Sequence, residues 1–155
     1  MQKITILSVG KIKEKYFQEA CQEYLKRISP YVRVEMEEVG AESFFGEGDK
    51  EKAKEKEGER ILKFLDRNDD CQIFLLEENG KEMDSVVFSQ KLEKIQQSII
   101  FVIAGALGFS DAVKKRGFEK LSLSQMTFPH ELARLVLLEQ VYRAATICNG
   151  KKYHY

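Results

Sequence analysis

Cysteine, histidine, proline and tryptophan are scarce in this 155-residue chain, which contains 3 Cys, 2 His, 2 Pro and no Trp. The three cysteines, Cys21, Cys71 and Cys148, lie far apart, and no Cys-x-x-Cys or Cys/His cluster occurs. An odd, scattered set of this kind is not typical of a disulfide framework or of a zinc site. We therefore expect free thiols in a reducing compartment and no bound metal.

An excess of charge of one sign and a long apolar run are missing as well. The 25 basic and 25 acidic residues cancel, so the formal net charge is zero. A zero net charge argues against a protein that coats nucleic acid through its overall field, although a local basic patch stays open. The longest apolar run, residues 99–109, is about half of what a membrane span needs. The N-terminus lacks the order of a signal peptide, so we expect a cytoplasmic protein with no membrane partner.

Segments with the periodicity of strands alternate with segments that have the periodicity of helices. The expected strands are 3–9, 32–39, 71–77, 99–105 and 120–124, and the expected long helices are 13–28, 50–65, 85–97 and 129–148. This alternation predicts an α/β three-layer sandwich with a mostly parallel sheet, and the length predicts a single domain over residues 1–155.

Three smaller signals mark the ends of these elements. Asn79-Gly80 is expected to end the third strand. Ser85 is expected to cap the helix that follows, with Val86 facing inward. Ser110 and Asp111 are expected to cap a short helix.

Ligands of open α/β sheets bind beyond the carboxyl ends of the strands. That rule points to three places: the residues after Leu76, the turn Ala104–Ser110 and the segment Leu123–His130. Gly105 and Gly108 form a Gly-x-x-Gly that by itself is more often a plain turn, and no Walker motif is present. The residues alone therefore indicate where a site would lie but leave its ligand open.

The last helix and the tail behind it carry three further features. The helix is apolar over so much of its circumference that we expect a subunit interface there, with Leu138 among the residues facing it. Arg143 follows Glu139 by four residues, which is the spacing of an ordinary ion pair. His154 lies in the terminal Lys-Lys-Tyr-His-Tyr, where chains usually fray.

Four segments together match a known family: "ITILSVGK", "KEKEGERIL", "MTFPHELARLVLLEQVYRA" and the closing "YH". The chain resembles the ribosomal RNA large subunit methyltransferase H family, which consists of SPOUT-class enzymes with a C-terminal trefoil knot. The resemblance extends from the first strand to the last residues. It implies an α/β-knot fold, a homodimer and S-adenosyl-L-methionine as the cofactor. It also implies methylation of N3 of a pseudouridine in 23S rRNA. The zero net charge favours the assembled ribosome over naked RNA as the substrate.

The resemblance also assigns residues to the site. Its cofactor contacts fall on one strand end, one turn and one loop, which comprise Leu76, Ala104, Gly105, Leu123, Ser124, Gln125, Met126, Thr127 and Phe128. The family usually has Gly-Gly where this chain has Ala104-Gly105, and Ala104 keeps a main-chain contact provided that its φ stays negative. The acceptor site falls on Arg143, Tyr153 and His154, which turns the tail from a frayed end into a positioned element.

The implied reaction is an in-line transfer of a methyl group to an imide nitrogen, and it requires no metal. His154 is the candidate general base, Arg143 would bind a phosphate or stabilise charge on the uracil oxygens, and Tyr153, Tyr155 or Tyr142 would stack on the base. Two other interpretations stay open. One is a non-catalytic module that binds RNA or the ribosome, and the other is a domain that binds a different adenine nucleotide.

Overall fold

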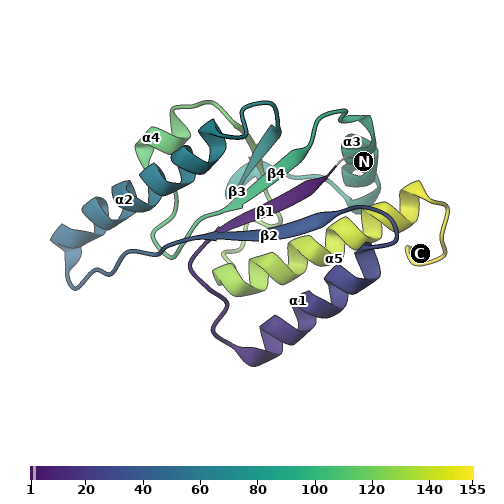
Figure 1. Ribbon diagram of the computed structural model, residues 1–155, viewed down its shortest axis with the longest axis horizontal. Helices are drawn as coiled ribbons and strands as arrows, with labels where there is room; N and C mark the ends of the chain where they lie inside the picture. The colour runs from purple at the N-terminus through teal and green to yellow at the C-terminus, as the bar shows by residue number, and fades with distance from the viewer. Residues whose placement is uncertain (2) are drawn as a thin grey trace.

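Five strands form one sheet with helices on both of its faces in the computed structural model, which describes residue 1 and residues 3–155 (Figure 1). The strands are β1 (Ile4–Val9), β2 (Val34–Val39), β3 (Gln72–Lys81), β4 (Ile99–Ile103) and β5 (Glu119–Leu121). The helices are α1 (Lys15–Ile28), α2 (Glu47–Asp66), α3 (Ser85–Lys94), α4 (Asp111–Lys114) and α5 (His130–Cys148). The strand order is β2-β1-β4-β3-β5 and every pairing is parallel, which confirms the predicted three-layer α/β fold.

Side chains of the central strands alternate between two hydrophobic cores. Ile4 and Ile6 of β1 face the layer that contains α5, whereas Leu7 and Val9 face α2. All five residues of β4 are buried, as is usual for a central parallel strand with helices on both faces. Figure 1 shows α2 and α4 over one face of the sheet and α1 and α5 over the other. The carboxyl ends of β1, β3 and β4 therefore open at the same edge, beside the start of α5.

Strand β3 runs past the predicted stop at Asn79-Gly80, so that prediction was wrong. The strand reaches Lys81 because its register with β5 shifts, and Leu121 pairs with both Leu76 and Lys81. Gly80 permits this arrangement, since a Cβ on it would lie 2.7 Å from the carbonyl carbon of Leu121. Glycine was a turn signal in the sequence, but here it allows two backbones to approach closely.

Segments 77–81 and 119–122 are far apart in the sequence and lie against each other. In addition to the close approach at Gly80, the Ser122 amide donates to the Lys81 carbonyl at 3.0 Å. This contact brings the start of the 123–128 loop to the carboxyl end of β3. The trefoil knot stays a prediction.

Two predicted details of the helices were wrong. Asp84 caps α3, because its carboxylate accepts from the Val87 amide at 2.8 Å, whereas the Ser85 hydroxyl donates to Gln140. Val86 points outward with 39% exposure. Ser110 caps α4 as expected, since its hydroxyl accepts from the Val113 amide.

Helix α5 is covered within the chain more fully than its composition indicated. Leu138 is 0% exposed, because α5 packs against the sheet, α1 and α3 at once. Leu138 therefore does not face a subunit interface, and that prediction was wrong. The apolar residues of α5 that keep partial exposure are Leu132, Leu135, Val136, Tyr142, Ile147 and Cys148.

The packing of α2 against the loop before α4 predicts an unusual effect of one substitution. A Cβ on Gly58 would lie 2.9 Å from Ser110 Cβ and closer still to its hydroxyl. Gly58→Ala should therefore destabilise the fold by about 1–3 kcal/mol through overpacking, although the same change in a helix normally stabilises by about 0.5–1 kcal/mol. Gly48→Ala in the same helix meets nothing within 4 Å and is the matched control. Urea unfolding in which Gly58→Ala is as stable as Gly48→Ala would contradict this packing.

Candidate active site

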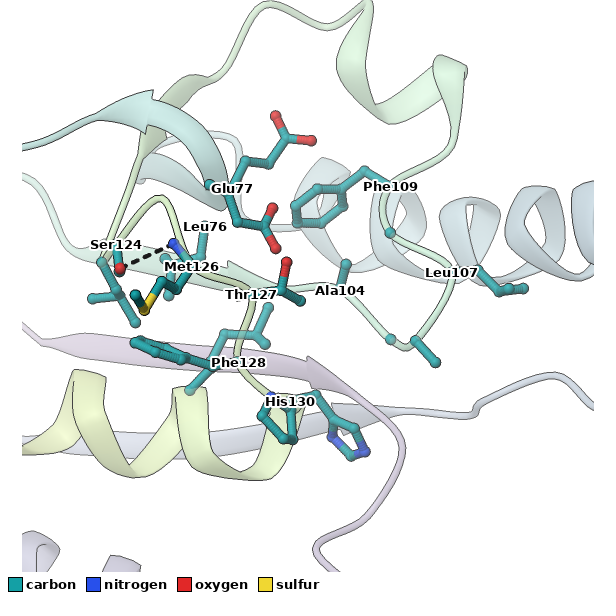
Figure 2. Close-up of a pocket in the computed structure, with 18 residues that line it drawn as sticks. Leu76, Glu77, Ala104, Leu107, Phe109, Ser124, Met126, Thr127, Phe128 and His130 are labelled. Atoms are coloured by element: carbon teal, nitrogen blue, oxygen red, sulfur yellow. Dashed lines mark hydrogen bonds between the residues drawn. The ribbon is translucent and has the colours of Figure 1, made fainter.

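A cavity of about 770 Å³ opens at the carboxyl ends of β3 and β4 (Figure 2). Its walls come from the end of β3, the turn after β4, the 123–128 loop and the first turn of α5. Figure 2 shows Leu76, Ala104 and Phe128 around the cavity, with Met126 and Thr127 on the loop that covers one side. The lining is mostly apolar with a few polar groups, which is the usual character of a small-molecule site.

The structure brings the predicted cofactor residues together. All of them except Gln125 line the cavity: Leu76, Ala104, Gly105, Leu123, Ser124, Met126, Thr127 and Phe128. Gln125 is exposed and does not line it. These segments are distant in sequence, and the parallel sheet places their ends at one edge.

The turn after β4 shows why its two glycines differ. Gly108 has a φ of 79°, and its amide donates to the Gly105 carbonyl at 3.1 Å, which closes the turn. Gly105 does not have a positive φ; a Cβ on it would lie 3.1 Å from Val9 Cγ1. No non-glycine residue in the described part of the chain has a positive φ, so Ala104 meets the condition under which it keeps a main-chain contact.

The 123–128 loop presents main-chain groups more than side chains. The Ser124 hydroxyl accepts from the Met126 amide at 3.0 Å (Figure 2), and the Met126 side chain is 75% exposed. The main-chain groups of Leu123, Thr127 and Phe128 form no hydrogen bond with any other described residue. They are available to form hydrogen bonds with a ligand.

The charge inside the cavity is negative. Glu77 and Glu78 line it, and none of the described residues that line it is a lysine or arginine. Glu77 is largely buried, and its carboxylate lies between two lysines that do not line the cavity: Oε1 is 3.8 Å from Lys114 Nζ and Oε2 is 3.2 Å from Lys120 Nζ, so part of its charge is compensated. This environment suits a cationic ligand and is unfavourable for the phosphates of ATP or NAD.

Arg134 holds the start of α5 against the end of β1. Its side chain is 0% exposed, and Nη2 donates to the Gly10 carbonyl at 2.7 Å and to the Val9 carbonyl at 3.3 Å. Nη1 donates to Glu38 Oε1 at 3.3 Å. Because the guanidinium supplies only donors, His130 Nδ1, 3.1 Å from Nη2, must accept, and the neutral ring then carries its proton on Nε2.

The predicted acceptor residues also form one cluster, at the other end of α5. Arg143 donates from Nε and Nη2 to Glu139 Oε1 at 3.0 and 2.6 Å, and its Nη1 lies 3.1 Å from His154 Nδ1. The Tyr153 hydroxyl donates to the same Glu139 oxygen at 3.1 Å, and the guanidinium lies over the Tyr153 ring at 4.8 Å. The Glu139–Arg143 ion pair is thus confirmed, and it also holds the tail. Burial, with help from Tyr24 and Glu139, raises the pKa of Tyr153 to about 12.

This cluster does not line the cavity of its own chain. Ala133 lines the cavity, and Arg143 is ten residues further along α5, roughly 15 Å at 1.5 Å per residue. Figure 1 shows the C-terminus beside the end of α5 that lies far from His130. His154 lines a separate cavity beside α3 instead.

The site also contains residues to which the sequence assigned no individual role. Glu77 and Glu78 directly follow Leu76, where the rule for strand ends places a site, but the rule gives a position and not the part that each residue plays. Phe109 and Ala133 line the cavity too, and neither differs in pattern from a core residue. His130 ends the segment Leu123–His130 that the strand-end rule indicated, and it lies at the cavity wall (Figure 2).

Two structural motifs are absent from the part of the chain that the structure describes. Outside Gln2, no helix is long and apolar enough to cross a membrane. The same residues contain no group of three or more His, Cys, Asp or Glu side chains that could hold a metal ion.

Comparisons with known proteins agree with the fold and identify the family. A family model described as predicted SPOUT methyltransferase matches residues 2–154, so the chain belongs to the SPOUT methyltransferase family. The chain is 42% identical to ribosomal RNA large subunit methyltransferase H of Desulfitobacterium hafniense, with 99% of each chain covered. It is 45% identical to the protein of the same name from Bacillus thuringiensis, over 97% of this chain and 98% of that one. Within SPOUT, it is a member of the ribosomal RNA large subunit methyltransferase H family.

Solved structures of more distant proteins share the fold. A probable methylase family protein from Haemophilus influenzae aligns with a TM-score of 0.55 at 12% identity, over 99% of this chain and 70% of that one. A probable rRNA-methyltransferase from Porphyromonas gingivalis aligns with a TM-score of 0.54 at 13% identity, over 95% and 70%. At these identities the likeness supports the architecture alone.

The environment of His130 predicts how stability depends on pH. Burial, and then the charge of Arg134, lower the pKa of His130 below its ordinary value of 6.5. The unfolded chain therefore takes up a proton at a higher pH than the folded chain does, and stability falls as pH drops below 6.5 toward the folded pKa. His130→Asn keeps an acceptor for Arg134 without titrating, so its unfolding free energy should decline less over that window. Parallel pH profiles for the variant and the wild type would contradict this role.

Proposed function

We propose that this protein transfers the methyl group of S-adenosyl-L-methionine to N3 of a pseudouridine in the 23S rRNA of assembled ribosomes. The observation that carries the proposal is the anionic cavity, whose loop offers free main-chain groups, in a chain of the ribosomal RNA large subunit methyltransferase H family. The whole chain, residues 1–155, would act as one SPOUT domain with its C-terminal part knotted. It would act in the cytoplasm, where ribosomes are found.

The residues of the cavity suit this cofactor. Main-chain groups of the Leu123–Phe128 loop would hold the adenine, with Leu76, Ala104 and Gly105 in contact with the nucleoside. The cofactor supplies a methyl group on a positively charged sulfonium, and the carboxylates of Glu77 and Glu78 favour that charge. The same carboxylates oppose a nucleotide that carries phosphates, which argues against an ATP or NAD site.

A homodimer would complete the site. Arg143, Tyr153 and His154 lie together but away from the cavity of their own chain, and a second copy packed antiparallel along α5 would bring them to the cavity of its partner. Leu132, Leu135 and Val136 keep partial exposure on α5 and would lie in that interface. The separation of the tail cluster from the cavity of its own chain thus supports the dimer. Leu138, which is buried within the chain, does not.

The tail cluster suggests how its members would act. Arg143 would bind a phosphate or the uracil oxygens, and Tyr153 would stack on the base. His154 can accept a proton only at Nδ1 if its Nε2 is protonated, and Nδ1 faces Arg143 at 3.1 Å. His154 would therefore become a base only after Arg143 turns toward the substrate, so that binding of RNA would release the proton acceptor.

A non-catalytic ribosome-binding module of the same fold is the alternative. Such a module would bind ribosomes and would have no use for a cavity suited to a sulfonium. Methylation is the property that separates the two functions.

Cofactor binding should depend on backbone geometry more than on side chains. Gly105→Val places a branched side chain where a Cβ alone lies 3.1 Å from Val9 Cγ1, and it should abolish measurable binding of S-adenosyl-L-methionine. Ser124→Ala removes only a hydroxyl that bonds within the loop, so its affinity should stay within about threefold, the effect of a hydrogen bond of modest strength. Calorimetry that finds the reverse order would contradict a main-chain site.

The function is tested with ribosomes that lack the modification. The wild-type protein should methylate them, and mass mapping should place the product on N3 of one pseudouridine in 23S rRNA. A chain without Tyr153–Tyr155 should still bind the cofactor but methylate about a hundred times more slowly, the usual scale for general acid–base groups. Methylation at the wild-type rate by the truncated chain would remove the tail from the site, and no methylation by the wild type would favour the non-catalytic module.

A mixing experiment tests the shared site. The Gly105→Val chain has a damaged cavity and an intact tail, and the truncated chain has the opposite. If the tail of one chain serves the cavity of the other, heterodimers of the two should regain activity, because each contains one complete site. Heterodimers that form but stay inactive would place the tail at the cavity of its own chain.

A further inference from the structure

A second cavity of about 490 Å³ lies beside the first, at the carboxyl ends of β1 and β2. The two share His130 and the turn residues Gly105, Ala106 and Leu107 as a common wall. In Figure 2, Leu107 and His130 lie at the side of the first cavity, away from Ser124 and Met126. The two cavities therefore adjoin at this turn, and a ligand long enough to pass the turn would reach both.

Glu57 is a buried carboxylate in the wall of the second cavity, and the function proposed above does not use it. It belongs to the "KEKEGERIL" segment of α2 and is 5% exposed. Its Oε2 accepts from the Glu42 amide at 3.0 Å, whereas Oε1 has no hydrogen-bond partner in the described part of the chain. Oε1 is directed at the shared turn, since a Cβ on Gly105 would lie 3.3 Å from it.

An unpaired carboxylate in this position is costly without a ligand. Burial raises the pKa of Glu57, with only partial compensation by the Glu42 amide and the charge of Arg60. Buried polar atoms in native proteins nearly always have a partner, so Oε1 of Glu57 is an acceptor available to a hydrogen-bond donor on a ligand in this cavity.

Basic groups complement this carboxylate across the same cavity. Glu38 and Glu42 line it as well, but they pair with Arg134 and with Lys56 and Arg60. Lys11 and Lys13, on the loop after β1, also line it, and neither ammonium group forms an ion pair among the described residues. The first cavity offers no lysine or arginine. An anionic group on the ligand would therefore find its counter-charge only in the second cavity.

We propose that the second cavity binds the α-amino acid end of the cofactor, with Glu57 accepting from its ammonium group and Lys11 and Lys13 facing its carboxylate. The inference rests on the proposed function, because it takes S-adenosyl-L-methionine as the ligand of the first cavity. An α-amino acid carries one positive and one negative group a few bonds apart, which matches a buried carboxylate opposite two lysines. The amino acid would also cover Oε1 of Glu57 and supply the donor it lacks.

The binding of two nucleosides distinguishes this subsite from the rest of the site. S-adenosylhomocysteine carries the amino acid end, and 5′-methylthioadenosine is the same thioether nucleoside without it. Glu57→Gln keeps the shape and the acceptor for the Glu42 amide but removes the charge. The variant should lower the affinity for S-adenosylhomocysteine by about tenfold or more, the usual scale for a charge-assisted hydrogen bond. Its affinity for 5′-methylthioadenosine should stay within about twofold of the wild-type value.

Matched variants sharpen the comparison. Glu59→Gln changes an exposed carboxylate of the same helix and should leave both affinities unchanged. The double variant Lys11→Ala, Lys13→Ala should lower the affinity for S-adenosylhomocysteine but not for 5′-methylthioadenosine. The loss should be smaller than in Glu57→Gln, because both lysines are exposed to solvent.

The outcomes are distinguishable by calorimetry. Selective loss of S-adenosylhomocysteine in Glu57→Gln supports the subsite. Equal loss of both nucleosides would make Glu57 a structural residue and overturn the inference, and so would unchanged binding of both. A wild-type protein that binds neither nucleoside would overturn the proposed function itself, and this inference with it.

Discussion

The buried guanidinium of Arg134 determines where α5 begins relative to the sheet, and the site depends on that position. Its hydrogen bonds to the Val9 and Gly10 carbonyls, to Glu38 and to His130 join three elements at one point. A charge with 0% exposure is tolerated only with such partners, and removing one side of a buried pair typically costs about 3–5 kcal/mol. Because the loop from Leu123 to Phe128 runs straight into α5, the same contact fixes the wall of the first cavity.

On the other side of the first cavity, the turn after β4 is held by close packing against α2 rather than by charged groups. Helix α2 approaches the 105–110 segment at Gly58, where no side chain fits beside Ser110, and the next residue toward the N-terminus is Glu57. This close packing brings the neighbouring Glu57 carboxylate against Gly105, where a Cβ would lie 3.3 Å from its Oε1. The structure thus buries one carboxylate beside the turn, and a buried charge is seldom kept without a ligand or a partner.

The order and type of the elements could be predicted from the sequence, because periodicity reports which faces of a segment are buried. The wrong predictions concern residues whose type is compatible with more than one structural role. Gly80 was taken for a turn, but it permits the close approach of Leu121. Leu138 was taken for an interface residue, because the sequence reports how apolar α5 is but not that three neighbours cover it. Asp84 replaced Ser85 as a cap since either residue suits that position.

The position of the site could be predicted from the residues alone, but its ligand and some of its residues could not. The strand-end rule located the cavity from the residues alone, since parallel strands bring their carboxyl ends to one edge whatever their side chains are. The identity of the ligand came from the resemblance, because a loop that binds through main-chain groups leaves no diagnostic side chains. Arg134 and Glu57 were missed for the opposite reason. An arginine or a glutamate in a charged helix is usually solvated, and only the packing shows that these two are not.

The distribution of charge has a consequence for the choice of substrate. A net charge of zero and an anionic cavity provide little long-range attraction for RNA. The lysines that could contact phosphates are local: Lys11 and Lys13 near the cavities, and Lys151 and Lys152 in the tail. In a dimer with a shared site, the tail of one chain and the loop after β1 of the other would flank the same opening. Contacts of that kind would position the RNA more than they would increase its affinity. They therefore suit a nucleotide that a folded particle already presents. The proposed ribosomal substrate follows from this limit on attraction as much as from the resemblance.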